Sequence, residues 1–487
     1  MRCVTKFSFA CVAWIGISLS PRADAQTGTV QVSSDPFTNP EAQHMTEVEP
    51  SVHAYGSTIV AVFQQGRVFG GGASDIGFAT STDSGVSWQY GSMPGLTIWA
   101  GGDFYTAITD PSITHSDRDG LFLAVATPYG PERREVLLSR SADGLNWDDP
   151  ISVFLGSPNA RFEGPWIDCD NWSASPFFGN CYIEWDDISA GFRIFMSTSS
   201  DGGATWSPPV ATAAIGNGGR PTAQPSGRVV VPYETTAGHI RGFTSDDGGE
   251  SWSPTISLAT VQEHYPTGNL REVGAPSVGI DGDGTVYVLW TDCRFRTSCP
   301  SNDLLMVSSS DGVNWSDIKR IPIDDVTSSA DHFLPGLGVD RNSFAPNVGL
   351  AVLYYYYPEA NCTEETCQLI AGFITSADGG DSWLDPVDLS EPMALDWLPD
   401  TSSGRMVGDY FSTYYTDDGV PHPVFAKATV PGELFFESMF TISRECLGPQ
   451  SFGRLPDRIP RSQLVEIPHD DDTLVRSTAG GKRSLER

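Results

Sequence analysis

Several acidic side chains and one tyrosine occupy positions where they can take part in acid–base or nucleophilic chemistry. Asp110 directly precedes a proline at the start of an apolar segment, Glu163 lies two residues before another proline, and Glu272 lies four residues before a third. Asp409 and Tyr410 stand in a comparable place near the end of the chain. A carboxyl group can protonate a leaving oxygen, and a phenol becomes a nucleophile when a carboxylate accepts its proton.

Arginines and further polar side chains alternate with these carboxylates along the chain. Arg220 precedes a proline as Asp110 does, and Asp292 and Arg294 follow the apolar segment 286–290. A single charged loop residue is usually only solvated, but interleaved arginines and carboxylates around one concave mouth would form a binding site. The side chains that we expect to bind substrate are Arg67, Arg220, Arg294, Arg405, Asp292 and His332.

An eight-residue pattern, Ser-x-Asp-x-Gly-x-x-Trp, recurs along the chain and predicts the elements that position these residues. It occupies residues 199–206, recurs at 81–88, 245–252 and 376–383, and is one residue shorter at 141–147 and 309–315. The Asp and Ser side chains can accept backbone N–H bonds in a tight turn, the Gly permits a positive φ, and the Trp can bury its ring. Each copy predicts a β-hairpin closed by its own side chains, within a repeat architecture.

These six copies resemble the Asp boxes, or BNR repeats, of sialidases and related secreted β-propellers. The resemblance implies that residues 26–446 form an all-β propeller, and a composition rich in Gly, Pro, Trp and Tyr is typical of an all-β protein with many turns. The match is specific for the repeat and much less so for any activity, because the repeated turn is structural.

The number of predicted blades follows from a second motif. In this motif a polar residue, often next to a proline, precedes a short apolar strand. Its seven occurrences lie near Glu49, Asp110, Glu163, Arg220, Ala275, His332 and Asp409. Residues 29–33 form a strand without a blade of their own and can supply the missing strand of the last blade. We therefore expect a seven-bladed β-propeller with Asp-box hairpins, with six blades as the alternative.

In such a propeller the inner strands begin on the face opposite the Asp boxes, so the predicted site residues converge there. The resemblance to sialidases implies Tyr410 as a nucleophile, Glu272 or Glu163 as its base, Asp110 as the acid/base, and arginines that hold a carboxylate. Residues 219–232 are similar to a mid-chain segment of that family. The family's opening Arg-Ile-Pro is replaced by Val48-Glu49-Pro50, which removes one charged fork for a carboxylate.

The resemblance implies a secreted, sialidase-like exo-glycosidase that acts on glycans, expected to be acidic, in a central pocket. Two alternatives stay open. One is a propeller that binds glycans or proteins without catalysis, and the other is a polysaccharide lyase in which a Tyr or His332 takes a proton beside a neutralised uronate. The residues at the strand starts differ from one predicted blade to the next, which favours one asymmetric site over a pocket repeated in every blade.

The N-terminus and the cysteines predict export to an extracellular or periplasmic location. Arg2 and Lys6 precede an apolar run, and Ala23-Asp24-Ala25 is a cleavage pattern, so residues 1–25 are expected to be a signal peptide. Outside that segment the close spacing of six cysteines predicts three local disulfides, which suit an oxidising compartment. The expected pairs are Cys169–Cys181, Cys293–Cys299 and Cys362–Cys367, and Cys446 is expected to be unpaired.

The net charge of the chain excludes some classes of partner, and the segments not yet described give little sign of a membrane anchor or a metal site. The net charge of −32 argues against nucleic acid and anionic membranes as partners, and no further segment is long and apolar enough for a membrane anchor. We expect no cofactor and no metal site, although Asp281 and Asp283 resemble part of a calcium loop as well as a plain turn. Residues 447–487 are polar and aperiodic, and we expect a flexible tail.

Overall fold

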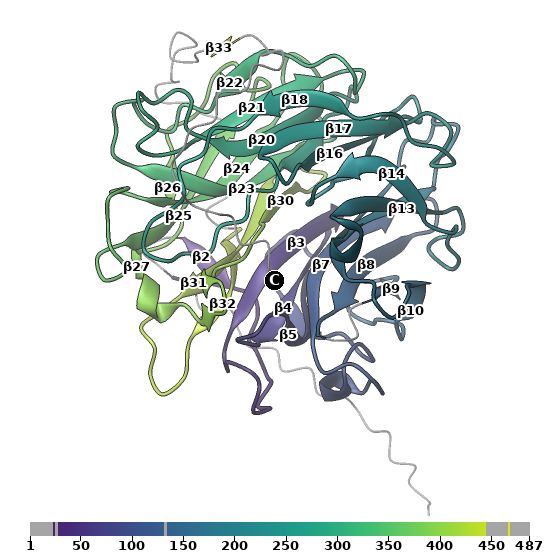
Figure 1. Cartoon of the computed structure of the whole chain (residues 1–487), viewed down its shortest axis with the longest axis horizontal. Coiled ribbons are helices and arrows are strands. Elements are labelled where there is room, and N and C mark those ends of the chain that lie inside the picture. The colour runs from purple at the N-terminus through teal and green to yellow at the C-terminus, as the bar shows by residue number, and fades with distance from the viewer. Residues whose placement is uncertain (1–22, 25–27, 131–133, 445–465, 468–487) are drawn as a thin grey trace, which may run out of the picture.

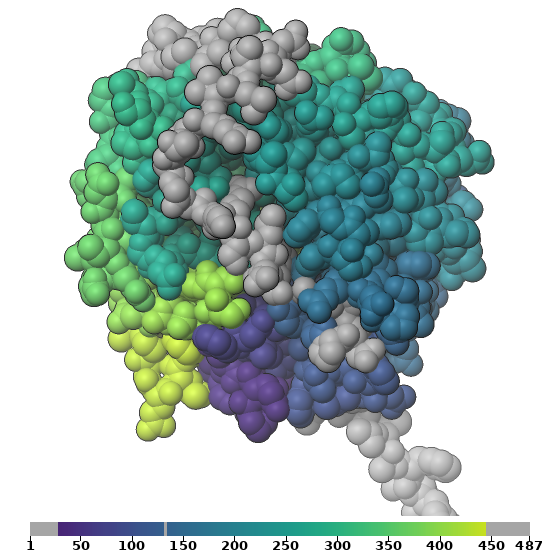
Figure 2. All heavy atoms as spheres, in the orientation of Figure 1, coloured from purple at the N-terminus to yellow at the C-terminus, as the bar shows by residue number. Residues whose placement is uncertain are grey.

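The computed structural model describes residues 23–24, 28–130, 134–444 and 466–467. Within those ranges the regular structure consists of β-strands and three short 3-10 turns, which confirms the all-β prediction. No helix in these ranges is long and apolar enough to cross a membrane. In Figure 1 the sheets follow one another around the centre of the molecule, and Figure 2 shows neighbouring sheets in contact along its rim.

Consecutive strands pair antiparallel in units of four, which we number as sheets, and the first four units account for residues 47–260. The first two units are joined into one eight-stranded sheet by a single residue pair, Ala73 with Ile108. The first contains β3 (Glu47–Tyr55), β4 (Thr58–Arg67), β5 (Ala73–Ser81) and β6 (Gln89–Ser92). The second contains β7 (Ile108–Ser116), β8 (Leu121–Pro128), β9 (Glu135–Ser141) and β10 (Ile151–Leu155). The third contains β11 (Phe162–Cys169), β12 (Cys181–Asp187), β13 (Arg193–Ser199) and β14 (Val210–Ile215). The fourth contains β15 (Thr222–Ala223), β16 (Val229–Glu234), β17 (His239–Ser245) and β18 (Ile256–Thr260).

Two further units and a composite one complete the series. The fifth contains β19 (Ser277–Ile280), β20 (Val286–Asp292), β21 (Asp303–Ser309) and β22 (Ile318–Arg320), on which β33 (Glu466–Ile467) pairs. The sixth contains β23 (Asp331–Val339), β24 (Leu350–Tyr357), β25 (Gln368–Ser376) and β26 (Val387–Asp388), and β27 (Met393–Ala394) also pairs with β25. The seventh contains β30 (Ser412–Tyr415), β31 (Pro421–Ala428) and β32 (Glu437–Ile442). A separate two-stranded hairpin joins β28 (Asp400–Thr401) to β29 (Gly404–Arg405).

The fourth strand of the seventh sheet comes from the other end of the chain. Strand β2 (Thr29–Gln31) pairs antiparallel with β32, with Thr29 opposite Ile442 and Gln31 opposite Phe440. This confirms the expectation that residues 29–33 serve the last sheet. On its other side β2 pairs with β1 (Ala23–Asp24).

Apolar side chains fill the spaces between neighbouring sheets, as expected when both faces of a sheet must leave water. Separate clusters lie between the first and second sheets and between the second and third. The largest cluster joins the sixth and seventh sheets to the first, and includes Val30, Phe63, Phe333 and Phe425. The seventh sheet therefore packs against the first through both strand pairing and a shared core.

The repeated Ser-x-Asp turns close as the sequence predicts. In residues 199–206 the Ser199 hydroxyl donates to Asp201 over 2.8 Å, and the amides of Gly203 and Thr205 donate to Ser199 and Asp201 over 3.0 and 2.9 Å. The Trp residues are less uniform than expected, because Trp383 is buried whereas Trp206 is only half-buried. The turns are thus fixed mainly by local hydrogen bonds.

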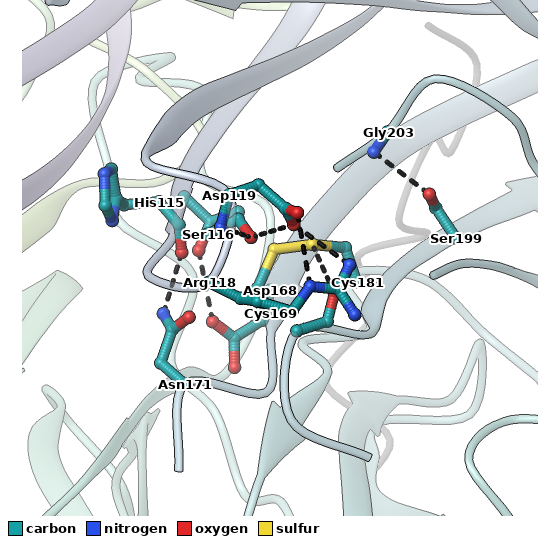
Figure 3. Close-up of a disulfide and its surroundings, with 12 residues drawn as sticks. His115, Ser116, Arg118, Asp119, Asp168, Cys169, Asn171, Cys181, Ser199 and Gly203 are labelled. Carbon is teal, nitrogen blue, oxygen red and sulfur yellow. Dashed lines mark hydrogen bonds and ion pairs between the residues drawn. A yellow bond between two sulfur atoms is a disulfide. The ribbon is translucent and has the colours of Figure 1, made fainter. Parts of the chain in front are cut away.

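All three predicted disulfides are present. Cys169 and Cys181 lie directly opposite each other on β11 and β12, close to the Ser199–Gly203 bond (Figure 3). The pairs Cys293–Cys299 and Cys362–Cys367 close the loops that follow β20 and β24. Disulfides of this kind are typical of proteins from oxidising compartments. Cys446, most of the predicted signal peptide and most of the predicted tail lie outside the described residues.

A buried carboxylate lies at the seam between the first and seventh sheets. Glu47 accepts hydrogen bonds from the Ser33 hydroxyl, from Gln65 over 2.9 Å and from the Met439 amide over 3.3 Å. Burial outweighs these bonds and raises the pKa of Glu47 to about 8. A carboxyl group with a raised pKa stabilises the fold while it is protonated, so this contribution is lost as the pH rises from about 4.5 to about 8.

We predict that Glu47→Gln flattens the pH dependence of stability. The amide stays neutral at every pH, so the melting temperature of the variant should fall less than that of the wild type between pH 5 and about pH 8. Thermal melts across this range test the prediction, with the exposed Glu250→Gln as the control that should follow the wild type. A decline as steep as that of the wild type would mean that Glu47 is ionised throughout.

Candidate functional site

A cavity lies where the segments that begin several strands meet. Its walls come from β7, from the ends of β11 and β12, and from the segments that precede β15, β19 and β30. The charged and aromatic side chains around it are Asp110, Glu163, Trp166, Asp186, Phe192, Arg220, Asp409 and Tyr410. Four carboxylates, one guanidinium group and three aromatic rings therefore share one space.

A β-bulge before a proline aims the residues at the strand starts. The pairing register shifts next to this position in β3, β7, β11 and β23. The residue before the proline has a positive φ in each of them: 58° at Glu49, 55° at Asp110, 57° at Gly164 and 52° at Leu334. Bulges redirect side chains, and a left-handed backbone is strained for residues other than glycine. This explains how Asp110 reaches the cavity although its strand continues into the core.

Hydrogen bonds then fix the Asp110 carboxylate. Its Oδ2 accepts the amide proton of Gly164 over 3.0 Å, and its Oδ1 accepts the Thr109 hydroxyl over 3.0 Å. The side chain is almost fully buried, with 1% of its surface exposed. Because Gly164 belongs to β11, this bond also joins the second sheet to the third at the cavity wall.

The face of the third sheet that is turned to the fourth carries three more acidic side chains. Glu163 lies opposite Asp186, and Trp166 lies opposite Glu184, so these four side chains share one face of β11 and β12. Gly219, which precedes Arg220, covers Glu184 so closely that a Cβ atom there would lie 2.6 Å from its carboxyl carbon. The fourth sheet can approach this acidic face only because a glycine stands at that point.

Glu184 is buried behind the cavity wall. Burial raises its pKa well above the usual range, and the charge of Asp186 raises it further, against smaller effects of Arg220 and the Gly219 amide. Burial and the neighbouring charge therefore both favour the neutral form of the Glu184 carboxyl group. Asp186, two residues further along the same strand, faces the cavity itself.

Arg220, Trp166 and Tyr410 form a stack at the base of the cavity. The Arg220 guanidinium carbon lies 3.7 Å from the centre of the Trp166 ring and 5.7 Å from that of Tyr410. The two rings meet edge to face, with their centres 5.3 Å apart. Burial lowers the pKa of Arg220 to about 10, so it remains charged at neutral pH. The Tyr410 hydroxyl donates to the carbonyl oxygen of Pro111 over 2.8 Å.

Asp409 is held by an arginine that the sequence did not single out. Arg271 Nε donates to Asp409 Oδ1 over 2.8 Å, and Arg271 Nη2 donates to the other carboxylate oxygen. Arg271 lies in a loop between β18 and β19, without a nearby motif that predicts this partner. Its neighbour Glu272, which the sequence did single out, is not among the residues that line the cavity, whereas Val273 is.

The structure thus brings together four of the predicted site residues: Asp110, Glu163, Arg220 and Tyr410. Asp409, which stands at the last predicted strand start, and Asp186 join them. Trp166 and Glu184 have no signal in the sequence beyond their positions on the two strands.

The other predicted binding residues lie outside the cavity lining and bond within the protein. Arg67 is buried and donates to Gln64 and to the Gly72 carbonyl, both over 3.0 Å. Asp292 and Arg294 pair with each other, with distances of 3.0 and 2.8 Å. Arg405 donates to the Leu398 carbonyl over 2.9 Å.

His332 belongs to a separate buried network. It lies with Asp303 and Asp324 in a cluster whose ligand atoms are within 4.8 Å of one another. Arg296 and Arg320 donate to Asp303 Oδ1 over 2.7 and 2.8 Å, so this oxygen already has two cationic partners. The cluster therefore suits a structural ion network better than a divalent cation.

The possible calcium ligands Asp281 and Asp283 also bond within the protein. Asp281 Oδ1 accepts the amides of Asp283 and Thr285 over 3.0 and 2.8 Å, and its Oδ2 accepts the Tyr287 hydroxyl. Asp283 Oδ2 accepts the amide of Ala345 over 2.8 Å. These bonds are those of a tight turn, and a calcium ion would have to compete with them.

We predict that Glu184→Gln leaves the stability of the fold nearly unchanged. Burial favours the neutral form of this carboxyl group, and the amide is neutral and of nearly equal volume, so the substitution should alter the free energy of unfolding by less than about 1.5 kcal/mol. Asp409→Asn, which breaks the ion pair with Arg271, should instead cost about 3–5 kcal/mol. Chemical denaturation of both variants tests this. A loss at Glu184 as large as that at Asp409 would show that Glu184 is an ionised partner of Arg220.

No family model matches the chain, and no curated protein matches it. Among solved structures, a Hadza microbial sialidase is 17% identical over 64% of this chain and 64% of its own, with a TM-score of 0.43. The intramolecular trans-sialidase of Ruminococcus gnavus is 15% identical over 86% and 98%, with a TM-score of 0.42. An ulvan lyase, solved with a bound oligosaccharide, is 13% identical over 84% and 94%, with a TM-score of 0.46. At these values the likeness assigns no activity to this chain.

Proposed function

We propose that this protein is a secreted seven-bladed β-propeller that hydrolyses glycosidic bonds in the cavity described above. The seven units of three or four consecutive strands, the first two of which join into one eight-stranded sheet, and the contribution of β2 to the last unit support the blade count over six. The observation that carries the function is the presence of Asp110, Glu163 and Asp186 beside the Trp166 ring in one cavity. Glycoside hydrolysis needs two carboxyl groups and a surface that orients the sugar.

The proposed reaction uses the carboxylates in two roles. Asp110 protonates the leaving oxygen as the glycosidic C–O bond breaks, and Glu163 or Asp186 supports the developing positive charge on the sugar. Water then adds to the anomeric carbon, and the Asp110 carboxylate, which has given up its proton, accepts a proton from this water. The apolar face of the sugar ring packs on Trp166, so the bond to be cleaved points to the acidic wall.

We assign Tyr410 a supporting role in this proposal. Its hydroxyl donates to the Pro111 carbonyl, next to the acid Asp110, and a bond to a carbonyl oxygen favours the neutral phenol. A nucleophilic Tyr410 would have to give up this bond and pass its proton to Glu163, since the other expected base, Glu272, is not in the cavity lining. The carboxylates need no such rearrangement.

The charge of the cavity favours a sugar without a negative charge. From the sequence we expected an acidic glycan, but among the described residues four carboxylates line the cavity and Arg220 is the one arginine in its lining. The Arg220 guanidinium stacks on Trp166, and Arg271 is already bonded to Asp409. An acidic sugar would meet more repulsion than attraction there, so we propose an uncharged glycan as the substrate.

We predict that the secreted protein releases sugars from uncharged glycans and that Asp110→Asn and Glu163→Gln each reduce turnover by about 10²–10⁴-fold. Tyr410→Phe should cost less than about tenfold, because it removes one ordinary hydrogen bond. Fluorogenic glycosides of neutral and acidic sugars, followed by polysaccharides with mass detection of products, provide the assay. Glu391→Gln, an exposed carboxylate far along the chain, is the matched control.

Other outcomes would select the alternatives. Unsaturated products from a uronate polymer, lost in Tyr410→Phe, would identify a lyase in which Tyr410 is the base and Arg220 neutralises the uronate. Binding to glycans without any product would identify a binding module. Loss of hydrolysis by several orders of magnitude in Tyr410→Phe, with Asp110→Asn active, would show that our assignment of roles is wrong.

A further inference from the structure

The connection between the fourth and fifth sheets, residues 261–276, follows an indirect course. It begins after β18 at Thr260 and ends before β19 at Ser277. The equivalent connection between the third and fourth sheets, residues 216–221, is much shorter. Long loops without regular structure of their own are uncommon within a compact domain and are often functional.

Contacts along this segment connect it to the sixth sheet as well as to the fifth. The His264 amide donates to Asn302 Oδ1 over 2.8 Å, and its ring nitrogen Nδ1 lies 3.1 Å from Asp331 Oδ2 at the start of the sixth sheet. The Thr267 hydroxyl donates to the carbonyl oxygen of Ala360 over 2.9 Å. The segment is therefore tied to the fifth and sixth sheets before it turns back.

The next residues reach the segment that leads into the seventh sheet. The Arg271 amide donates to the Arg405 carbonyl over 2.7 Å, and the Arg405 amide donates to the Asn269 carbonyl over 2.8 Å. The side chain of Arg271 then pairs with Asp409 through both of its carboxylate oxygens. Two residues later Val273 lines the cavity.

We propose that residues 261–276 form a strap along the cavity and that Arg271 is a positioning residue for the proposed reaction. A guanidinium group bound to both carboxylate oxygens fixes direction as well as distance. Only 9% of the Arg271 side chain and 2% of the Asp409 side chain are exposed, so water does not weaken the pair much. Asp409 and Tyr410 are thereby held in the cavity wall.

The turn that carries these residues contains a glycine in an unusual backbone conformation. Gly408 has a φ of 142°, which other residues rarely adopt, and a Cβ atom there would lie 3.0 Å from the Glu49 amide nitrogen. A glycine loses more conformational freedom on folding than any other residue. The fork from Arg271 supplies a bond from outside the turn, and small displacements of groups in an active site reduce turnover strongly.

This inference rests on the proposed function for its kinetic part, and its structural part can be measured alone. In the full-length, disulfide-bonded protein, Arg271→Gln should lower kcat on a cleaved glycan by about 100-fold, with a smaller change in KM. Arg271→Lys keeps the charge without the fork and should recover part of the loss. Hydrogen exchange of the amides in residues 408–411 should become faster in Arg271→Gln.

A matched control is available in Arg228→Gln. Arg228 makes the same fork to Asp246, with distances of 2.6 and 3.0 Å, but on an exposed surface. This variant should leave both kcat and exchange at residues 408–411 unchanged. Unchanged exchange in Arg271→Gln would overturn the inference, and so would faster exchange with full kcat. If the wild type cleaves no glycan, the proposed function fails, and the exchange data still decide whether Arg271 positions this turn.

Discussion

The pairing of β2 with β32 is the constraint on which the arrangement of the sheets depends. The first four strands of each of the first six units come from one continuous stretch of chain, but the seventh unit needs residues 29–31 from the opposite end. The entropic cost of closing so large a loop grows only with the logarithm of its length. It is offset by backbone bonds and by an apolar cluster that joins the sixth, seventh and first sheets.

The cavity depends on that arrangement because no single sheet can build it. Asp110 comes from the second sheet, Glu163 and Asp186 from the third, Arg220 from the start of the fourth, and Tyr410 from the start of the seventh. Two of these charged groups have specific neighbours that stabilise them at low exposure. Asp110 accepts an amide from the third sheet, and Arg220 lies over an aromatic ring.

Local patterns in the sequence predicted the parts of this structure that depend on local physics. The Ser-x-Asp turns close within eight residues, and the three disulfides close loops of similar size, so spacing alone was informative. The motif of a polar residue before a proline located Asp110 and Arg220, because the segments that carry these two residues both lead to the cavity. The polar residues at the starts of the strands were therefore the part of the sequence that best indicated the site.

Long-range partners were beyond what spacing can predict. Arg294 follows Asp292 closely enough to pair with it, and that local ion pair engages the charge from which we expected a role in binding. His332 similarly joins a buried network built from three other segments. Conversely, Arg271 forms an ion pair with Asp409, which lies far away in the sequence. Glu184 is covered by Gly219, which belongs to another sheet. Such contacts depend on how the sheets pack and on nothing local.

The central claim is that a sugar binds on Trp166 between the acidic side chains of the second and third sheets. A crystal structure of the Asp110→Asn variant soaked with the glycan that the wild type cleaves tests it most directly. Our account predicts a sugar ring packed on Trp166, with its glycosidic oxygen within hydrogen-bond reach of residue 110 and its anomeric carbon facing Glu163 or Asp186. A sugar bound elsewhere, with this cavity holding only water, would contradict it.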